Sequence, residues 1–431
     1  MSDTKNTALN IKQEFFKYVS LSILGLIGIS CYILIDTYFI SKGEGNLGLT
    51  ALNVAIPAFY VMNAIGLMIG IGGATKYSIT KKSEIFTHAL IISVIFSIIF
   101  FMAGIFFARN ISVLLGADDN VIDITASYLR VLLCFSPAFM LNNLFMAFIR
   151  NDNKPHLVTV AMSLGSLFNI IFDYIFIFPL GLGMFGAALA TGFSPAISLL
   201  IMSLHKIKKQ NSFHIVSVKP SLSAFWQISA PGMSTFITEL ANSVVVFVFN
   251  IIILKISGNI GVAAYGVIAN IAMIVMALFT GLSQGMQPLL SREYGLGHKE
   301  NVKKLYRLGI TFSLFLSIAV YIFLFISVNP VISIFNSEGN ETLTNIAYTG
   351  IHLYFLSLFF TGLNIVKSGY YSAVNSVKYG FIISILRGFV IIIPAVFIMS
   401  KLLGINGVWI SLAVTDGIVF VICCFLPNKK Q

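Results

Sequence analysis

Residues 168–178 read FNIIFDYIFIF, an apolar run in which Asn169 and Asp173 are the strongly polar residues. The surrounding apolar stretch, 156–179, has about the 20 residues that a helix needs to cross a bilayer. A carboxylate inside such a span costs at least a few kcal/mol, so we treat Asp173 as a functional residue. Asn169 precedes Asp173 by one helical turn and lies on the same helix face.

Stretches of this kind recur along the whole chain. Its 431 residues are 57% hydrophobic and only 10% charged, with a mean hydropathy of +0.92, whereas soluble chains carry roughly 25% charged residues. The polar first eighteen residues have no small-residue cleavage site, so we expect no removable signal peptide. We predict an all-α integral membrane protein with twelve transmembrane helices, at about 15–41, 50–75, 86–108, 124–149, 156–179, 184–205, 223–254, 261–289, 304–328, 343–372, 377–399 and 406–426.

The basic residues are distributed unevenly between the two sides of the predicted membrane. With the N-terminus inside, nineteen of the 27 Lys and Arg fall in cytoplasmic segments and four in outer loops. This asymmetry is typical of membrane proteins whose positive loops stay in the cytoplasm. The net charge of +11 therefore reflects topology and not nucleic-acid binding. We expect a multi-pass protein of a prokaryotic cytoplasmic (inner) membrane, with both termini cytoplasmic.

The chain also contains an internal repeat. A shift of 213 aligns Gly48 with Gly261 and Gly72 with Gly285, and a shift of 221 does the same for several later pairs. We therefore predict two pseudo-symmetric six-helix lobes, at 1–213 and 222–431, joined by a cytoplasmic linker at 214–221. Two lobes of the same orientation commonly enclose a central cavity that opens to each side in turn. A transporter is the natural interpretation.

Four polar residues of the N-terminal lobe are predicted to meet at one level. Asp36, Asp173 and Thr191 lie on three spans, each within roughly 8–12 Å of the outer surface at 1.5 Å per residue, and Asn169 lies one turn deeper. Two carboxylates close together in a low dielectric need a shared proton or a metal cation. Hard oxygen ligands suit Na⁺ or H⁺ and disfavour transition metals. We predict a cation site at these four residues.

The repeat provides a control for this prediction. At a shift of 221, Asn169 aligns with Val390 and Asp173 with Pro394, so the C-terminal lobe does not repeat the ligands. A cation site is therefore expected in the N-terminal lobe only. The alternative interpretation is that Asp36 and Asp173 are interfacial residues, each hydrogen-bonded to nearby backbone.

Three further charged residues fall inside predicted spans. Glu239, near the middle of 223–254, is a candidate for binding a cationic substrate or a second proton, and the alternative is a structural hydrogen bond to a neighbouring helix. Asp416 is a weaker functional candidate. Arg387 is expected to form a structural ion pair with one of these acids.

Several motifs resemble the multidrug and toxic compound extrusion (MATE) transporters. They cover nearly the whole chain in order: IDTYFI at 35–40, AFIRNDNKP at 147–155, NIIFDYIFIF at 169–178, GAALAT at 186–191, GLSQGMQP at 281–288, and Leu386-Arg387 with Ile393-Pro394. Two segments depart from the family pattern. Residues 292–295 read REYG where Tyr-Asn-Tyr-Gly is common, and 72–77 lack the usual Ser-rich run that ends in Arg.

The resemblance implies an efflux antiporter with twelve helices in two lobes. Such proteins exchange inward-moving Na⁺ or H⁺ for outgoing organic cations and other amphipathic toxins. By position, Asp36, Asn169, Asp173 and Thr191 match the family's cation-binding network. Glu239 matches in kind an acid that some branches use for coupling.

We therefore predict a secondary active multidrug efflux antiporter, a transporter and not an enzyme. It is expected to need no cofactor besides the coupling ion, to act as a monomer in the lipid bilayer, and to bind small-molecule drugs but no nucleic acid. The main alternative is a lipid-linked oligosaccharide flippase of the same superfamily, whose pyrophosphate substrate would require Arg and Lys in the cavity. A receptor, a scaffold or an intramembrane enzyme is disfavoured, because the sequence has no nucleophile–base or metal motif.

Overall fold

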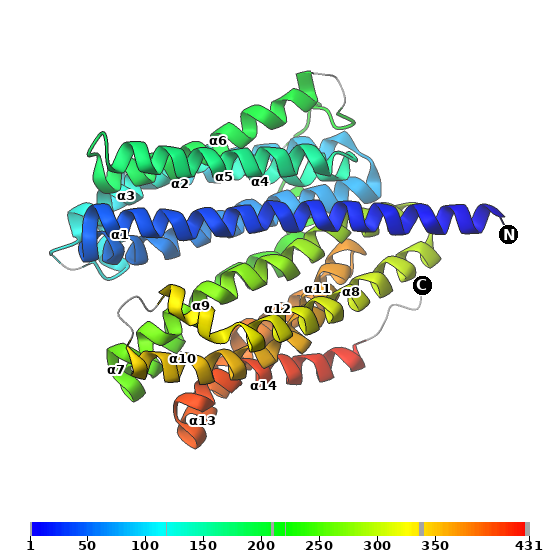
Figure 1. Cartoon of the computed structure of the whole chain (residues 1–431). Helices are drawn as coiled ribbons and strands as arrows, with labels where there is room; N and C mark the ends of the chain where they lie inside the picture. The colour runs from blue at the N-terminus through cyan, green and yellow to red at the C-terminus, as the bar shows by residue number, and fades with distance from the viewer. Residues whose placement is uncertain (1, 118, 208–210, 220, 336–339, 427–431) are drawn as a thin grey trace. The chain divides into compact units, whose positions relative to one another are not determined.

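The computed structural model describes residues 2–117, 119–207, 211–219, 221–335 and 340–426, and these residues form helices and no strand (Figure 1). This confirms the predicted all-α class. The elements are α1 (Ser2–Thr80), α2 (Ser83–Leu114), α3 (Ile122–Cys134), α4 (Ser136–Asn151), α5 (Pro155–Ile177), α6 (Gly183–Ile207), α7 (Leu222–Gly295), α8 (Lys299–Ile326), α9 (Val328–Phe335), α10 (Glu341–Tyr354), the 3₁₀ turn η1 (Phe355–Ser357), α11 (Leu358–Ala373), α12 (Val377–Ile385), the π turn η2 (Leu386–Val390), α13 (Ile392–Leu403) and α14 (Ile405–Phe425).

The two longest helices, α1 and α7, each contain two membrane spans joined at a glycine. The backbone leaves the helical conformation at Gly45 (φ 63°, ψ −151°) and at Gly258 (φ 61°, ψ −159°). A positive φ of this kind is accessible to glycine without steric cost. The two breaks are separated by the same 213 positions that align Gly48 with Gly261 in the sequence.

The number of spans agrees with the prediction. Eleven helices of the described residues are long and apolar enough to cross a membrane, and the bent pair α3 and α4 brings the number to twelve if it forms one span. The pair bends by 46°. Pro137 at the start of α4 supplies no backbone N–H to the preceding turn, which explains a break at this position.

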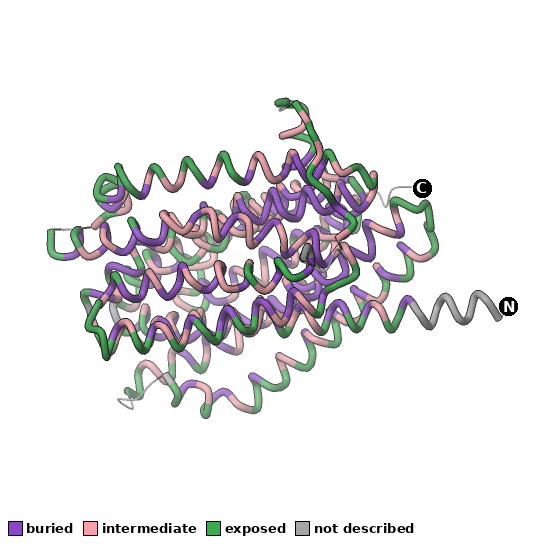
Figure 2. Tube along the Cα trace, turned by 90° about the horizontal axis from the view of Figure 1, so that it is seen from above, coloured by how far each residue is buried: buried purple, intermediate pink, exposed green. Residues whose placement is uncertain are grey.

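Each helix has one packed face, as the alternation of buried and exposed residues along the chain shows (Figure 2). Many of the exposed positions carry large apolar side chains, among them Phe106, Leu114 and Phe315. Such faces are expected where helices contact lipid, because the bilayer core accepts apolar side chains and excludes unpaired polar groups.

The chain packs as two compact units. The N-terminal unit is Ser20–Phe236, and the C-terminal unit is Ile237–Gln431 together with Met1–Val19. These units are defined by packing, whereas the predicted lobes and linker are defined by sequence symmetry. The predicted lobe boundaries and the predicted central cavity remain predictions.

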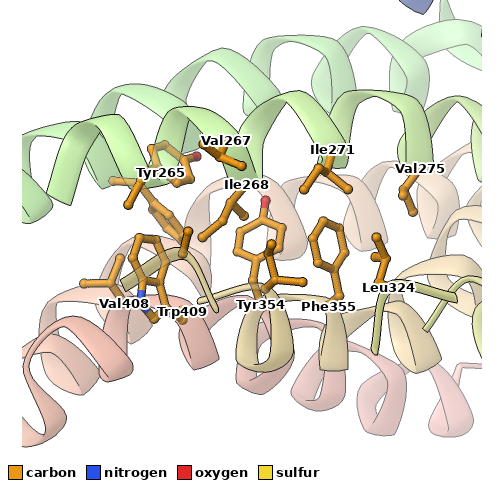
Figure 3. Close-up of a cluster of buried hydrophobic side chains, with 14 of the residues drawn as sticks. Tyr265, Val267, Ile268, Ile271, Val275, Leu324, Tyr354, Phe355, Val408 and Trp409 are labelled. Atoms are coloured by element: carbon orange, nitrogen blue, oxygen red, sulfur yellow. The ribbon is translucent and has the colours of Figure 1, made fainter. Parts of the chain in front are cut away.

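In the C-terminal unit, an aromatic and aliphatic core lies between α7, α10 and α14. Tyr265, Ile268, Tyr354, Phe355 and Trp409 are among its members (Figure 3). The first segment of α1 belongs to the same unit. Its residue Glu14 accepts a hydrogen bond from Arg292 at 2.6 Å.

Arg292 and Glu293 are the residues that depart from the family pattern at 292–295, and they form a local polar network. Glu293 is buried and accepts hydrogen bonds from Arg292 at 3.0 Å and from Asn301 at 2.8 Å, and it lies 2.9 Å from His298 Nδ1. The departure therefore places a polar network at the end of α7.

In the N-terminal unit, the segment at 211–219 is packed against the helix ends and is not a free tether. Phe213 is buried against the rings of Phe86, Phe145 and Phe148. Asp152 accepts a hydrogen bond from the backbone N–H of Ser212 at 2.8 Å. Within the predicted linker itself, the backbone N–H of Val216 donates to Thr87 Oγ1 at 3.0 Å, so its described part packs with this unit.

Helix α7 begins inside the N-terminal unit, where it crosses α1 at two glycines. A Cβ at Gly72 would lie 2.0 Å from the carbonyl oxygen of Ile228, and a Cβ at Gly232 would lie 2.0 Å from that of Met68. Neither position has room for any side chain, because the obstacle in each case is backbone.

We expect the substitution Gly72→Ala to lower the melting temperature of the purified protein. Forcing a methyl group into this contact should cost about 1–3 kcal/mol, because two helix backbones must separate. The matched control is Gly266→Ala, at a helical glycine with open space around it, where the better helix propensity of alanine should leave stability unchanged or slightly higher. Equal melting temperatures for the two variants would contradict the close crossing.

Candidate cation site

The four residues predicted to bind a cation lie together in the N-terminal unit. Asp36 is on the first span of α1 (Ile11–Gly45), Asn169 and Asp173 are on α5, and Thr191 is on α6. All four are buried, with exposed fractions of 6%, 0%, 0% and 7% respectively. The carboxyl groups of Asp36 and Asp173 are within hydrogen-bonding reach of each other.

Asn169 connects α5 to α6 through its side-chain amide. In the orientation that satisfies both ends of the amide, its nitrogen donates to Asp173 Oδ2 at 3.1 Å and its oxygen accepts from the backbone N–H of Thr191 at 3.2 Å. The assignment of amide oxygen and nitrogen follows from these partners. Asn169 thereby fixes the position of one carboxylate oxygen and leaves the other free.

One oxygen of each carboxyl group, Oδ1 of Asp36 and Oδ1 of Asp173, is buried without a hydrogen-bond partner among the described residues. The side-chain hydroxyl of Thr191 lies within hydrogen-bonding reach of Tyr128. A buried polar atom in this state costs about 1–3 kcal/mol unless a ligand or water completes it. Two carboxyl groups in contact, with free oxygens beside a hydroxyl, fit a proton or a small hard cation such as Na⁺.

The chemistry of the donors does not fit a transition metal. In the part of the chain that the structure describes, no group of three or more His, Cys, Asp or Glu side chains is arranged to hold a metal ion. Carboxylate, amide and hydroxyl oxygens are ligands of hard cations, whereas imidazole and thiolate ligands characterise zinc and copper sites.

The helices that carry the site are held close together by small and hydroxyl side chains. A Cβ at Gly165 of α5 would lie 2.3 Å from Ser198 Oγ of α6, so only glycine permits this approach. Ser198 donates to the Ala161 carbonyl at 2.9 Å. Thr159 of α5 donates to the carbonyl of Leu21 in α1 at 2.8 Å. These contacts fix the three helices that place the acids.

Pro195 adds a further oxygen to this region. It lies inside α6, one turn after Thr191, and proline has no backbone N–H to donate to the carbonyl four residues earlier. The carbonyl of Thr191 therefore lacks its regular helical donor. The spacing of four residues between Thr191 and Pro195 in the sequence is the pattern that predicts the loss of this helical hydrogen bond.

Two tyrosines next to the site were not predicted. Tyr32 and Tyr128 are both buried, and both lie near Asp36 and Asp173. Tyr32 is one helical turn before Asp36, so helical spacing predicts a shared face. No sequence pattern identifies Tyr128, because it reaches the site from α3.

Glu239 lies in a different unit from these four residues. Glu239 is partly buried and lies on the segment of α7 that belongs to the C-terminal unit. Its neighbour Thr238 donates a hydrogen bond to Ser384 at 3.2 Å. The predicted pairing of Arg387 with an intramembrane acid is present, since its Nε lies 2.6 Å from Asp416 Oδ1.

Comparisons with known proteins identify the family. The MatE family model matches residues 22–175 and 235–398. A "Multidrug export protein MepA" of Staphylococcus saprophyticus subsp. saprophyticus is 25% identical over 397 residues, which cover 90% of this chain and 87% of the relative.

Solved structures show the same fold. A MATE protein in the straight conformation superposes with a TM-score of 0.89 at 22% identity, covering 96% of this chain and 94% of the other. A transporter of the MOP superfamily from Pyrococcus furiosus, described by a reverse polarity of its binding pocket, superposes with a TM-score of 0.87 at 21% identity over the same shares. Together with the family match, these findings establish that the chain belongs to the MatE family and is a multi-pass membrane transporter, not an enzyme.

Proposed function

We propose that this transporter is a secondary active multidrug exporter that exchanges inward-moving Na⁺ or H⁺ for organic cations and other amphipathic drugs. The single observation that carries the proposal is the contact between the buried carboxyl groups of Asp36 and Asp173. The buried Oδ1 atoms of the two carboxyl groups have no hydrogen-bond partner among the described residues, and a shared proton or a small cation would satisfy both. The naming of the relatives as multidrug export proteins supports the choice of drugs as the outgoing substrate.

The coupling ion would act by changing which conformation is stable. At an effective dielectric of about 20, two unit charges about 4 Å apart repel by about 4 kcal/mol. Binding a proton or Na⁺ removes this repulsion, and a difference of that size between two conformations shifts their ratio by nearly a thousandfold. Coupling then requires that the cation binds one conformation more tightly than the other.

Glu239 is the second acid that we assign to transport. A carboxylate inside a membrane span and partly buried attracts a cationic substrate or a second proton. This role is separate from the cation site in the N-terminal unit. The transporter is proposed to work as a monomer in a prokaryotic cytoplasmic membrane with both termini inside.

The charge of the buried polar groups disfavours a lipid-linked oligosaccharide flippase. The pyrophosphate of such a substrate needs uncompensated basic groups. The guanidinium of Arg387 is already paired with Asp416, and the unpartnered atoms at Asp36 and Asp173 are carboxylate oxygens. The fold alone does not choose between these substrates, because MatE-like structures with binding pockets of reverse polarity share it.

We expect Asp36→Asn and Asp173→Asn each to abolish drug resistance while the protein still reaches the membrane. Each substitution removes one of the two charges, so the repulsion that cation binding is proposed to relieve no longer exists. Resistance is measured as the lowest drug concentration that stops growth of cells expressing each variant, and expression as the amount of intact protein in the membrane fraction.

The control for these variants is Asp123→Asn, which makes the same chemical change at an exposed carboxylate paired with Arg109. Surface ion pairs contribute little to stability, so resistance should stay at the wild-type level. Wild-type resistance in the Asp36→Asn or Asp173→Asn cells, at equal expression, would refute the assignment of the coupling site.

We expect export of a cationic fluorescent dye from proteoliposomes to follow an imposed ion gradient. Purified protein is reconstituted, and the Na⁺ gradient and the pH gradient are varied independently. Transport driven by one of them identifies the coupling ion, and a flippase would instead move a labelled lipid-linked pyrophosphate. Dye movement that is the same with and without both gradients would exclude an antiporter.

A further inference from the structure

The C-terminal unit contains a second buried polar cluster, centred on Asp416 of α14. Asp416 is fully buried, and donors reach both of its carboxylate oxygens. Arg387 donates from Nε to Oδ1 at 2.6 Å and from Nη2 to Oδ2 at 3.4 Å. Thr361 donates from Oγ1 to Oδ2, and Asn364 donates from Nδ2 to Oδ1 at 3.3 Å and to the Asp416 carbonyl at 2.9 Å.

This cluster contains the same three kinds of polar side chain as the cation site of the N-terminal unit. Each contains an aspartate, an asparagine amide and a threonine hydroxyl. The fourth member differs in charge, because it is Asp36 in the N-terminal unit and Arg387 in the C-terminal unit. The sequence repeat does not predict this correspondence, since Asp173 aligns with Pro394 and not with Asp416.

The charge difference determines whether each cluster has room for a cation. In the N-terminal unit, Oδ1 of both Asp36 and Asp173 lacks a partner. In the C-terminal unit, the guanidinium bonds both oxygens of Asp416 and supplies one positive charge. A buried carboxylate that is paired and fully hydrogen-bonded gains nothing from a further proton or cation.

The local backbone places Arg387 on Asp416. Arg387 lies in the π turn η2, and such turns insert one extra residue that changes the face on which the following side chains point. The next residue, Gly388, packs directly on α7, since a Cβ there would lie 2.3 Å from Ala241 Cβ. This close approach fixes the turn, and the side chain of Arg387 is only 14% exposed.

Further oxygens lie beside the cluster. Oδ1 of Asn364 and Oγ of Ser357 are buried without a hydrogen-bond partner in the described residues. A cavity of about 20 Å³, lined by Tyr354, Ser357 and Thr361 among others, has space for about one water-sized group. The oxygens needed to hold a small cation are therefore present once the guanidinium is removed.

We propose that Asp416, Thr361 and Asn364 form a latent cation site that the Arg387 guanidinium occupies as a tethered cation. Because Arg387 occupies the site, Asp416 does not bind and release the coupling ion. Of the two clusters, only the one in the N-terminal unit does so. That last consequence rests on the proposed antiport function, whereas the latent site itself does not.

The test is rescue of a truncated arginine by free guanidinium ion, measured without transport. The variants Arg387→Ala and Arg387→Ala/Asp416→Asn are purified in a background that carries Asp36→Asn and Asp173→Asn, so that the first cation site is absent. Melting temperatures are recorded in millimolar guanidinium chloride, sodium chloride and choline chloride at equal ionic strength. Because the readout is stability, a failure here is distinguishable from a failure of the antiport proposal.

Guanidinium is expected to raise the melting temperature of Arg387→Ala by a few degrees, since a ligand that binds only the folded state stabilises it. Choline, which is too large for the space, should not. The effect should be absent when Asp416→Asn is added. The same response to guanidinium in both variants, or no response in either, would overturn the proposal.

A second comparison covers the case in which Arg387→Ala does not fold. Removing one partner of a buried ion pair destabilises strongly, whereas replacing both partners by neutral groups is far milder. The yield of monodisperse protein extracted from membranes should therefore be much lower for Arg387→Met than for Arg387→Met/Asp416→Asn. Equal yields would show that Asp416 does not depend on the guanidinium, and would also overturn the proposal.

Discussion

The contact between the carboxyl groups of Asp36 and Asp173 is the interaction that gives the N-terminal unit its chemistry. Two acids held together inside a membrane bundle are stable only with a shared proton or cation. The helices around them are arranged to maintain that contact. Gly165 lets α5 and α6 approach each other closely. The hydrogen bond from Thr159 to the Leu21 carbonyl attaches α1 to α5, and the Asn169 amide donates to Asp173.

The two units solve the same electrostatic problem in opposite ways. The C-terminal unit supplies a permanent counter-charge, Arg387, which donates hydrogen bonds to both carboxylate oxygens of Asp416. The N-terminal unit supplies a second acid, Asp36, and leaves one oxygen of each of the two carboxyl groups without a partner. A site whose counter-charge is covalently attached has no exchangeable ion, whereas a site that lacks one must obtain it from solution. This asymmetry is a physical basis for the proposed antiport in a chain whose sequence contains a repeat.

Much of this arrangement could be predicted from the sequence. The positions of Asp36, Asp173 and Thr191 relative to the ends of their spans predicted one common depth, because the rise per residue of a helix is fixed. The class of fold followed from span length and composition. The break between consecutive spans was predicted as a loop of several residues, whereas the backbone leaves the helical conformation at a single glycine, Gly45 or Gly258.

Contacts between helices were the part that the sequence did not specify. Tyr128 approaches the site from α3, and neither spacing nor composition relates it to Asp36. The pairing of Arg387 with an acid was expected, but Thr361 and Asn364 were not, since they reach Asp416 from another helix. The π turn that contains Arg387 was not predicted from the sequence, nor was the close packing of Gly388 against Ala241 within it.

The most direct measurement of the central claim is the release of the coupling ion when a drug binds. Purified protein in detergent is loaded with ²²Na⁺ or equilibrated in weakly buffered solution with a pH indicator, and a cationic drug is then added. We predict that the drug displaces Na⁺ or protons from the wild-type protein and displaces neither from Asp173→Asn. Drug binding to the wild-type protein without release of either ion would contradict the account.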